Sequence, residues 1–272
     1  MSQWDESSTW EGHGLRREVF FFSSRDVQLY GSLFVASEPS RPFGLLACGS
    51  WGVDADRTDA LLRSAALAMA KLGGAGLVFH YPGYGDSYGD LAEVDLDDLR
   101  DAAVDAASEA ARRCPELDWI LAGFMFGGSV ASLARSHTAG EQLLLVQPAL
   151  RPGSYFRTLA KRSEPLAPGP TPREMMTSGS TPGMAYGYPV PARVRERADE
   201  ADAEVAAALA GFDGEGTAIG YPLREREEPE PLPERFGRIE VPGRWYFGAE
   251  NHPRLAAAVA AWLDERTAGE AR

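Results

Sequence analysis

Two of the four histidines in this sequence stand close to the ends of apolar segments, where side chains can reach a site. His80 lies near the end of the run AGLVFHY at 75–81, and His252 opens the segment HPRL before a helical pattern. An imidazole gains or loses a proton near neutral pH, so both are candidates for general acid–base catalysis. His13 and His137 fall on a polar tail and a polar helix end, where we expect them to be solvated.

A turn bracketed by glycines lies within LDWILAGFMFGGSVASLARS, residues 117–136. The apolar run before the turn predicts a strand buried on both faces, and the apolar spacing after it predicts a helix. Glycines permit a sharp turn and close helix packing, and here they are Gly123, Gly127 and Gly128. Met125 stands at the centre of this turn. A thioether cannot be deprotonated, so we expect no covalent catalysis by this residue.

Apolar strands alternate with amphipathic helices along the chain, and these elements must position the site. We expect two strands within 17–36 around a turn at 23–26, with Gly31 marking a bulge. Further strands are expected at 43–49, at 75–81, before Met125, within 141–150, at 216–223 and at 243–248, and helices at 55–72, 92–113, 192–210 and 252–265. The alternation implies βαβ units and therefore an α/β protein with a parallel sheet.

Four segments, in this order, are similar to motifs of the α/β-hydrolase superfamily: CGSWG at 48–52, HYPGYGDS at 80–87, GFMFGG at 123–128, and HPRL at 252–255. Together they cover about 200 residues. The resemblance implies a mostly parallel eight-stranded sheet with helices on both faces and an inserted cap. It also puts Met125 where the superfamily carries its nucleophile. A looser resemblance is to exosortase-associated hydrolase-like proteins, which often lack that serine and carry a stretch like GYPL at 220–223.

The resemblance also places the two histidines at one edge of the sheet. The third strand would lie between the fourth and fifth, so that Cys48, His80 and Met125 meet at their carboxyl ends. His80 stands where the superfamily has Asp or Asn, and its alternative role is to tie down the following loop. His252 occupies the position of the superfamily's catalytic base. The alternative for His252 is a helix neighbour left behind after the nucleophile was lost.

Backbone donors at this edge are expected to form an oxyanion hole. The N–H of Phe126 would point there together with an N–H of Ser50 or Trp51, and such donors stabilise an alkoxide or enolate as well as a tetrahedral intermediate. Apolar side chains would line a pocket for a sizeable organic molecule. They are Trp51, Phe124, Met125 and Phe126, with Tyr155 facing the pocket from the cap. The alternative is that these aromatic residues only fill the core.

Another residue could in principle replace the missing nucleophile. Cys48 is expected to be a buried strand residue, which usually behaves as a small hydrophobic side chain. Ser50 and Ser87 lie on loops, and Ser129 begins a helix. A nucleophile needs an exposed oxygen or sulfur beside a base, so these four are alternatives to a non-covalent site rather than its first interpretation.

The middle of the chain is predicted to interrupt the core. We expect a first core part at 15–150, a cap at 151–215 and a second core part at 216–268. Prolines, methionines and tyrosines crowd 151–191, which is typical of a lid over a site or, alternatively, of a disordered linker. Tyr186 and Tyr188 are further candidates to face the pocket.

Composition narrows the functional classes. The formal net charge is −13 and the pI is near 4.8, which argues against nucleic acids and anionic membranes as partners. Two cysteines cannot form a disulfide framework and suit a reducing cytoplasm. The N-terminus lacks signal-peptide features, and no apolar run reaches the roughly 20 residues of a membrane helix. We expect a small-molecule substrate, no cofactor and no metal, with a homodimer as the alternative to a monomer.

These observations favour a lyase or cyclase that acts on a small, apolar, oxygen-rich metabolite in bacterial secondary metabolism. His252 and His80 would supply acid–base chemistry without a serine nucleophile. Two alternatives stay open at this point. One is an esterase or thioesterase with a displaced nucleophile, and the other is a pseudohydrolase that binds a ligand or partner without catalysis.

Overall fold

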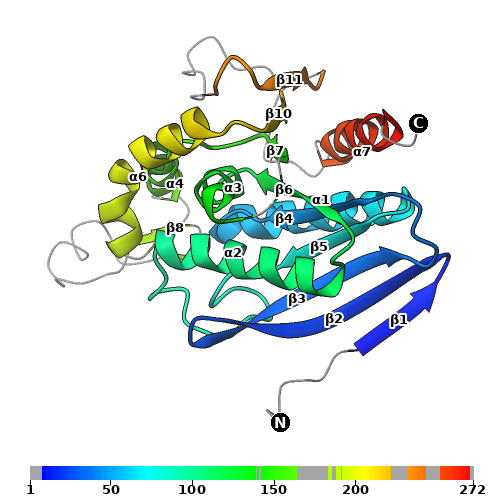
Figure 1. Cartoon of the computed structure of the whole chain (residues 1–272). Helices are drawn as coiled ribbons and strands as arrows, with labels where there is room; N and C mark the ends of the chain where they lie inside the picture. The colour runs from blue at the N-terminus through cyan, green and yellow to red at the C-terminus, as the bar shows by residue number, and fades with distance from the viewer. Residues whose placement is uncertain are drawn as a thin grey trace, which may run out of the picture.

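The computed structural model describes residues 8–138, 140, 142–163, 183–185, 188–190, 192–221, 232–242 and 252–269. Strands and helices alternate along the chain after an initial run of strands (Figure 1). In chain order they are β1 (Ser8–Gly12), β2 (Leu15–Ser24), β3 (Val27–Ala36), β4 (Phe43–Cys48), α1 (Gly52–Lys71), β5 (Ala75–Phe79), α2 (Leu96–Arg113), β6 (Asp118–Phe124), α3 (Gly127–Ala134), a 3₁₀ turn (Arg135–His137), β7 (Gln142–Val146), α4 (Pro152–Ser163), β8 (Gly183–Ala185), β9 (Tyr188–Val190), α6 (Ala192–Gly211), β10 (Glu215–Gly220), β11 (Gly237–Glu240) and α7 (His252–Gly269).

One mixed sheet organises the molecule, in the order β1-β2-β3-β5-β4-β6-β7-β10-β11. The pairs from β5 through β11 are parallel, and those among β1, β2, β3 and β5 are antiparallel. The strand at 43–48 therefore lies between those at 75–79 and 118–124, as predicted. The α/β class with a mostly parallel sheet is confirmed. All the parallel strands end at one edge, and the turn that holds Met125 lies there.

The described sheet has nine strands where the sequence predicts eight. β1 pairs with β2 through a two-residue turn at His13 and Gly14, whose φ angles are 54° and 73°. Positive φ at both positions is typical of tight hairpin turns, so His13 belongs to a hairpin rather than to a tail. β11 was not predicted from the sequence, and the strand predicted at 243–248 lies outside the described residues.

The bulge predicted at Gly31 is absent from β3, because its register with β2 is unbroken from 15–24 to 27–36. Gly31 pairs with Phe20, whose ring lies across the position that a Cβ of residue 31 would take. The glycine therefore makes room for a buried aromatic ring, which is the other common reason for glycine within a strand.

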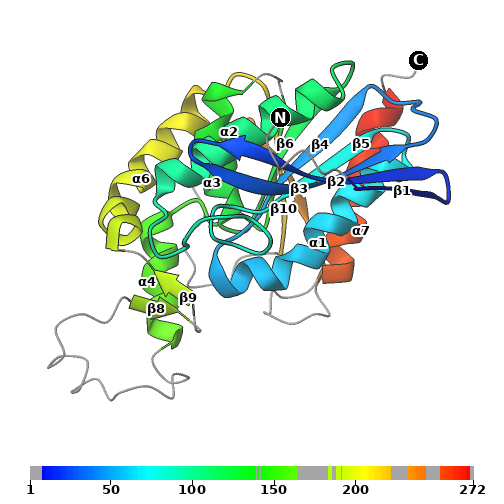
Figure 2. The ribbon, with the colours of Figure 1, turned by 90° about the horizontal axis from the view of Figure 1, so that it is seen from below.

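Helices cover both faces of the sheet (Figure 2). One buried cluster packs α2, α3, α4 and α6 against the sheet, and a second packs α1 and α7 against its other face. α2 begins with a capping box formed by Asp95 and Asp98, and it ends with Arg112 and Arg113, so its charges complement the helix dipole. Its buried stripe of Leu and Ala faces the sheet. The predicted amphipathic pattern of this helix is confirmed.

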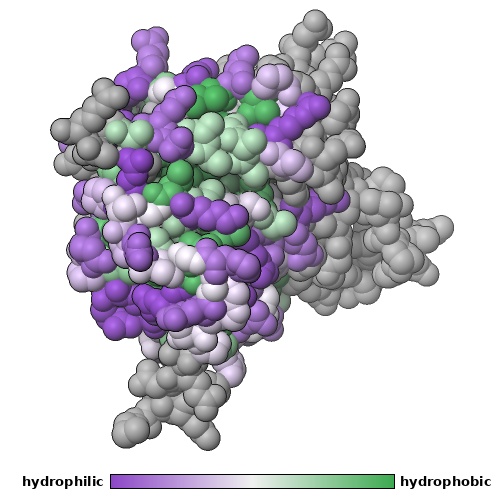
Figure 3. Space-filling model, turned by 90° about the vertical axis from the view of Figure 1, so that its right-hand side faces the viewer, coloured by the Kyte–Doolittle hydropathy of each residue, from purple (hydrophilic) through white to green (hydrophobic). Residues whose placement is uncertain are grey.

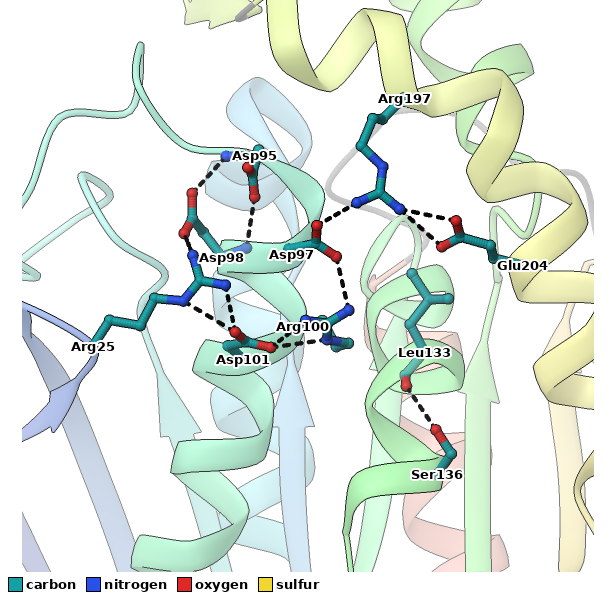
Figure 4. Close-up of polar contacts among 10 residues, drawn as sticks. All are labelled: Arg25, Asp95, Asp97, Asp98, Arg100, Asp101, Leu133, Ser136, Arg197 and Glu204. Carbon is teal, nitrogen blue, oxygen red and sulfur yellow. Dashed lines mark hydrogen bonds and ion pairs between the residues drawn. The ribbon is translucent and has the colours of Figure 1, made fainter.

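An ion-pair chain joins the β2–β3 turn, α2 and α6 (Figure 4). Asp97 of α2 is the middle of the chain, since it pairs with Arg100 at 2.7 Å and also with Arg197 of α6. The chain consists of Arg25, Asp97, Asp98, Arg100, Asp101, Arg197 and Glu204. These side chains are partly exposed, so each pair stabilises α6 only modestly.

The segment between β7 and β10 is where the sequence predicts the cap. Its described parts are α4, the β8–β9 ribbon and α6. The N–H of Gly153 at the start of α4 donates to the Asp202 carboxylate of α6 at 2.8 Å, and Arg157 pairs with Asp199. α4 is thus fixed to α6, and α6 to α2. Residues 164–182 and the side chains of Tyr186 and Tyr188 lie outside the described part.

On the face turned toward the viewer in Figure 3, hydrophilic and hydrophobic residues are interspersed.

At the amino edge of the parallel strands, far from Met125, a cavity of about 490 Å³ lies between the β1–β2 turn and the end of α1. His13, Glu38 and Lys71 contribute to its lining. Within the described part of the chain, no helix combines the length and the apolarity that crossing a membrane requires.

Candidate functional site

Met125 lies in a left-handed turn between the end of β6 and the start of α3, with φ 53°. Its N–H donates to the carbonyl of Val146 at 3.0 Å. Its carbonyl accepts from the N–H groups of Gly128 at 2.9 Å and Ala149 at 3.0 Å. A residue with a side chain adopts this conformation at a cost on the order of 1 kcal/mol, and these three hydrogen bonds hold it there.

The glycines around Met125 are needed for close backbone packing. A Cβ on Gly123 would meet the backbone of Gly127 and Gly128, and a Cβ on Gly127 would meet the carbonyls of Cys48 and Gly49. The start of α3 therefore sits directly on the ends of β4 and β6. This is the tight strand–turn–helix that the glycine bracket predicts.

A hydrogen-bond relay crosses the space above this turn. The N–H of Phe126 donates to Ser50 Oγ at 3.3 Å, Ser50 Oγ lies 3.3 Å from the Tyr155 hydroxyl, and that hydroxyl donates to Asp54 Oδ2 at 2.9 Å. The backbone N–H can only donate and the carboxylate can only accept. The protons must therefore run in one direction, with Ser50 donating to Tyr155 and Tyr155 donating to Asp54. We call Phe126, Ser50, Tyr155 and Asp54 the relay.

Asp54 sets the electrostatics of the relay. It lies in the first turn of α1, where the helix dipole favours a negative charge, and only 1% of its surface is exposed. Arg57 Nη1 lies 3.5 Å from its other oxygen. Burial, followed by the charge of Asp54, raises the pKa of Tyr155 well above its usual value of 10.0. Tyr155 is therefore neutral at physiological pH and acts as a donor.

Aromatic rings fill the space beside the relay. The rings of Phe126 and Tyr155 stack at 4.9 Å with an angle of 17°, and Phe156 packs with its edge toward both, at 5.1 and 5.2 Å. Trp51 meets Phe156 at 6.1 Å. The indole N–H of Trp51 is buried and has no hydrogen-bond partner among the described residues. We call Trp51, Phe126, Tyr155 and Phe156 the aromatic group.

The sequence prediction grouped these residues only in part. Ser50, Trp51, Phe126 and Tyr155 come together as expected, although Ser50 contributes its hydroxyl rather than its N–H. Phe124 points to the other face of the sheet, where it packs in the cluster with α1 and α7. Its predicted pocket-lining role has no supporting contact with the aromatic group in the described part of the chain.

No protein-family model matches the sequence, and no curated protein matches it. Solved structures do match over nearly the whole chain. XC6422 from Xanthomonas campestris, a member of the α/β serine hydrolases without a lid, gives a TM-score of 0.58 at 15% identity over 92% of this chain and 95% of that one. The chain has the α/β-hydrolase fold.

Two other neighbours were solved with a bound ligand. Est1E from Butyrivibrio proteoclasticus with ferulic acid bound gives a TM-score of 0.61 at 15% identity, over 92% of this chain and 99% of that one. DcsB in complex with its substrate analogue gives 0.60 at 15% identity, over 93% and 99%. Identities this low relate the folds alone. In the α/β-hydrolase fold a sharp strand–turn–helix of this kind is the nucleophile elbow. That Met125 stands at the position of the nucleophile stays a prediction.

His80 is held by its own loop and by neighbouring elements. Its Nδ1 accepts from the N–H of Asp86 at 3.1 Å, and its ring stacks on Tyr30 of β3 at 4.7 Å. The proton of a neutral ring is then on Nε2, which lies 3.9 Å from Asp59 of α1. Ser87 closes the loop by donating to the carbonyl of His80 at 2.7 Å. These contacts match the loop-anchoring alternative, and a catalytic role for His80 stays a prediction.

His252 is the first residue of α7, and its side chain lies outside the described residues together with Glu225, Glu250 and Asn251. The start of α7 is nevertheless fixed near the carboxyl edge of the sheet, because Arg254 donates to the carbonyl of Pro242 at 3.2 Å, just after β11. The helix therefore begins at the same edge as the elbow. The role of His252 as a base stays a prediction.

The alternative nucleophiles are all engaged. Burial raises the pKa of the Cys48 thiol from 9.0 to about 12, so it is not a thiolate at neutral pH. Ser129 Oγ donates to the carbonyl of Ala149 at 2.6 Å, and Ser87 is bound within its loop. Ser50 is bound to Phe126 and Tyr155. None of these four lies next to a free base in the described part of the structure.

The described residues contain no group of three or more His, Cys, Asp or Glu side chains placed to hold a metal ion. Sequence reasoning missed Phe156 of the aromatic group and Asp54 of the relay. For Asp54 the reason is plain. In the sequence Asp54 is only an acidic residue near the start of a predicted helix. Such residues are common there, because a negative charge interacts favourably with the helix dipole.

Proposed function

We propose that the protein is an enzyme that transforms a small organic molecule without a covalent intermediate, as a lyase or a cyclase. The relay is the observation that carries this proposal. It brings the Phe126 N–H and the hydroxyls of Ser50 and Tyr155 together beside the turn at Met125, which we interpret as a nucleophile elbow without its nucleophile. Hydrogen-bond donors of this kind stabilise charge that develops on an oxygen, whichever bond is broken.

In an elimination, a base removes a proton from the carbon next to a carbonyl group. The electron pair of that bond moves onto the carbonyl oxygen, and the leaving group then departs with the electrons of its own bond. If the side chain of Ser50 turns from Tyr155 toward the substrate, the N–H of Phe126 and the hydroxyl of Ser50 both donate to that oxygen. A cyclisation would use the same donors while the carbanion attacks within the molecule.

The base in this proposal is His252, because α7 begins at the edge of the sheet where the relay lies. His80 is the second candidate, and its bonds to Asp86 and Tyr30 make it the weaker one. We place the core at 15–150 and 216–268 and the cap at 151–215, with α4 covering the site. We further propose that the protein acts in the cytoplasm of a bacterium, in secondary metabolism. This part of the proposal is based on composition.

A hydrolase with Ser50 as displaced nucleophile is the less favoured alternative. Ser50 Oγ binds the N–H of Phe126, so an attack by this oxygen would consume the donor that the resulting oxyanion needs. Tyr155 cannot serve as its base near pH 7, because its pKa is raised. A pseudohydrolase agrees with the filled site, since Tyr155 itself occupies the space in front of the elbow.

The test is a panel of β-substituted carbonyl compounds and matched esters, followed by NMR in water enriched in oxygen-18. Elimination or cyclisation gives products without the heavy oxygen, whereas hydrolysis transfers it to the acid product. We expect turnover without incorporation, and a loss of roughly 10²- to 10³-fold in Ser50→Ala. Ser132→Ala is the matched control, because among the described residues the Ser132 hydroxyl bonds to the carbonyl of Gly128 within α3 and not to the relay. Incorporation of oxygen-18 would establish the hydrolase instead. A lack of turnover across the whole panel would support the pseudohydrolase.

A further inference from the structure

We propose that Tyr155 occupies a binding site for a phenolic ring, so that the protein closes this site with its own side chain until a planar phenolic ligand replaces it. The inference names the class of ligand that the proposed enzyme would bind. That this ligand is also a substrate rests on the proposed function. Binding itself is independent of turnover.

The first argument is that, among the described residues, the core supplies the polar partners of the Tyr155 phenol. Its hydroxyl meets Asp54 Oδ2 at 2.9 Å, Ser50 Oγ at 3.3 Å and the carbonyl of Trp51 at 3.4 Å. All three lie more than 100 residues away in sequence, on the β4–α1 junction. α4 brings only the phenol itself, which therefore sits in these groups as a bound ligand would.

The second argument is the flat surface that receives the ring. Phe126 is fully buried at the elbow and stacks on the phenol at 4.9 Å with an angle of 17°. Offset stacking of this kind favours planar aromatic groups over aliphatic ones. Phe126 belongs to the core, so its face remains when Tyr155 leaves and is then available to another ring.

The third argument is that the core buries polar groups that need a partner. A carboxylate as buried as Asp54 is costly unless it is paired and hydrogen-bonded, and its hydroxyl donor comes from α4. The indole N–H of Trp51 has no acceptor among the described residues. A ligand with a phenol hydroxyl would replace the donor that Asp54 loses when Tyr155 leaves.

α4 is held in a way that permits exchange. Tyr155 itself is partly exposed, and α4 is attached to α6 through the Gly153–Asp202 hydrogen bond and the Arg157–Asp199 ion pair. α6 in turn meets α2 through Arg197 and Asp97 (Figure 4). Ion pairs at the surface contribute little, so among the described residues the aromatic group, the relay and the buried Leu159 hold α4 on the core.

The experiment measures the affinity of 4-methylphenol and toluene, which differ by one hydroxyl group, by calorimetric titration. Tyr155→Ala removes the internal ring, and we expect it to bind 4-methylphenol roughly 10-fold or more tighter than toluene, because the hydroxyl meets a charged acceptor. Phe156→Ala is the matched control, since it opens an apolar space without freeing Asp54, and we expect no such preference. Equal affinities in folded Tyr155→Ala, or binding of neither probe, would refute the proposal.

A conservative variant keeps the test valid if Tyr155→Ala does not fold. Tyr155→Phe retains the ring but loses the bond to Asp54, so it competes less well with an external phenol. We expect 4-hydroxycinnamate to bind this variant several-fold tighter than wild type, and cinnamate to gain less. Unchanged or weaker binding of 4-hydroxycinnamate contradicts the proposal. Phenol binding without turnover would support the binding site and count against the proposed enzyme. Turnover without phenol binding would support the enzyme and refute the binding site.

Discussion

The hydroxyl of Ser50 lies 3.3 Å from the backbone nitrogen of Phe126 and accepts its hydrogen bond. Phe126 follows the elbow residue, so this N–H is the one that faces an oxyanion in enzymes of the α/β-hydrolase fold. Here a side chain of the protein takes the place of that oxygen. If Met125 stands at the position of the nucleophile, as the sequence predicts, the N–H that would serve an oxyanion is bound by the protein's own Ser50.

The first prediction concerns serine-directed reagents. Fluorophosphonates should leave the protein unlabelled, because Met125 is no nucleophile and the hydroxyls of Ser50, Ser87 and Ser129 are engaged in hydrogen bonds among the described residues. Intact-protein mass spectrometry, with a serine esterase as positive control, measures this. A stoichiometric adduct mapped to Ser50 or Ser87 would instead support the displaced nucleophile.

The second prediction concerns coupling within the relay. Ser50→Ala and Tyr155→Phe should each lower the free energy of unfolding by about 1–3 kcal/mol, because each leaves a buried polar group without its partner. The double variant should lose less than the sum, since the two hydroxyls share one hydrogen bond. Urea denaturation measures all three. Tyr84→Phe is the control, as the Tyr84 hydroxyl binds Asp56 at the surface, and additivity of the two relay variants would contradict the coupling.

The third prediction concerns alkaline pH. Burial raises the pKa of Cys48 from 9.0 to about 12, and burial with the charge of Asp54 raises that of Tyr155 above 10.0. A raised pKa means that the fold favours the neutral form, so its contribution to stability is complete below the unfolded pKa and is lost as pH rises toward the folded one. The free energy of unfolding should therefore fall above about pH 9, and Cys48→Ala should fall less steeply. Identical slopes for the variant and wild type would contradict this assignment.

Much of the fold was predictable because it depends on patterns of residues that are close together in the sequence. The glycines around Met125 predict the turn, since helix α3 can approach β4 and β6 only where side chains are absent. Alternation of apolar strands with helices predicts the parallel part of the sheet. β1 escaped prediction because its hairpin depends on positive φ at His13, a residue that signals such turns less clearly than Asn does.

The relay was harder to predict because it is not local. Ser50 and Phe126 could be paired from the resemblance alone, as their segments have fixed places in the superfamily. Tyr155 and Asp54 are 101 residues apart, and α4 lies in a proline-rich segment that the sequence describes only as a cap. Nothing in the residues around Asp54 indicates that an inserted helix will cover its carboxylate.

The last prediction separates the two histidines. His252→Ala should lower turnover by roughly 10²- to 10⁴-fold with the fold intact, because a general base contributes about that much and its helix is held by the apolar residues of α7. His80→Ala should mainly lower stability, because it removes the acceptor for the Asp86 N–H and the ring stacked on Tyr30. Met125→Ala should change turnover little, as its thioether acts only through packing. Single-turnover rates and urea denaturation of the three variants, measured once the substrate panel identifies a reaction, decide between these effects. Wild-type rates in both histidine variants together with a slow Met125→Ala would show that neither imidazole moves the proton.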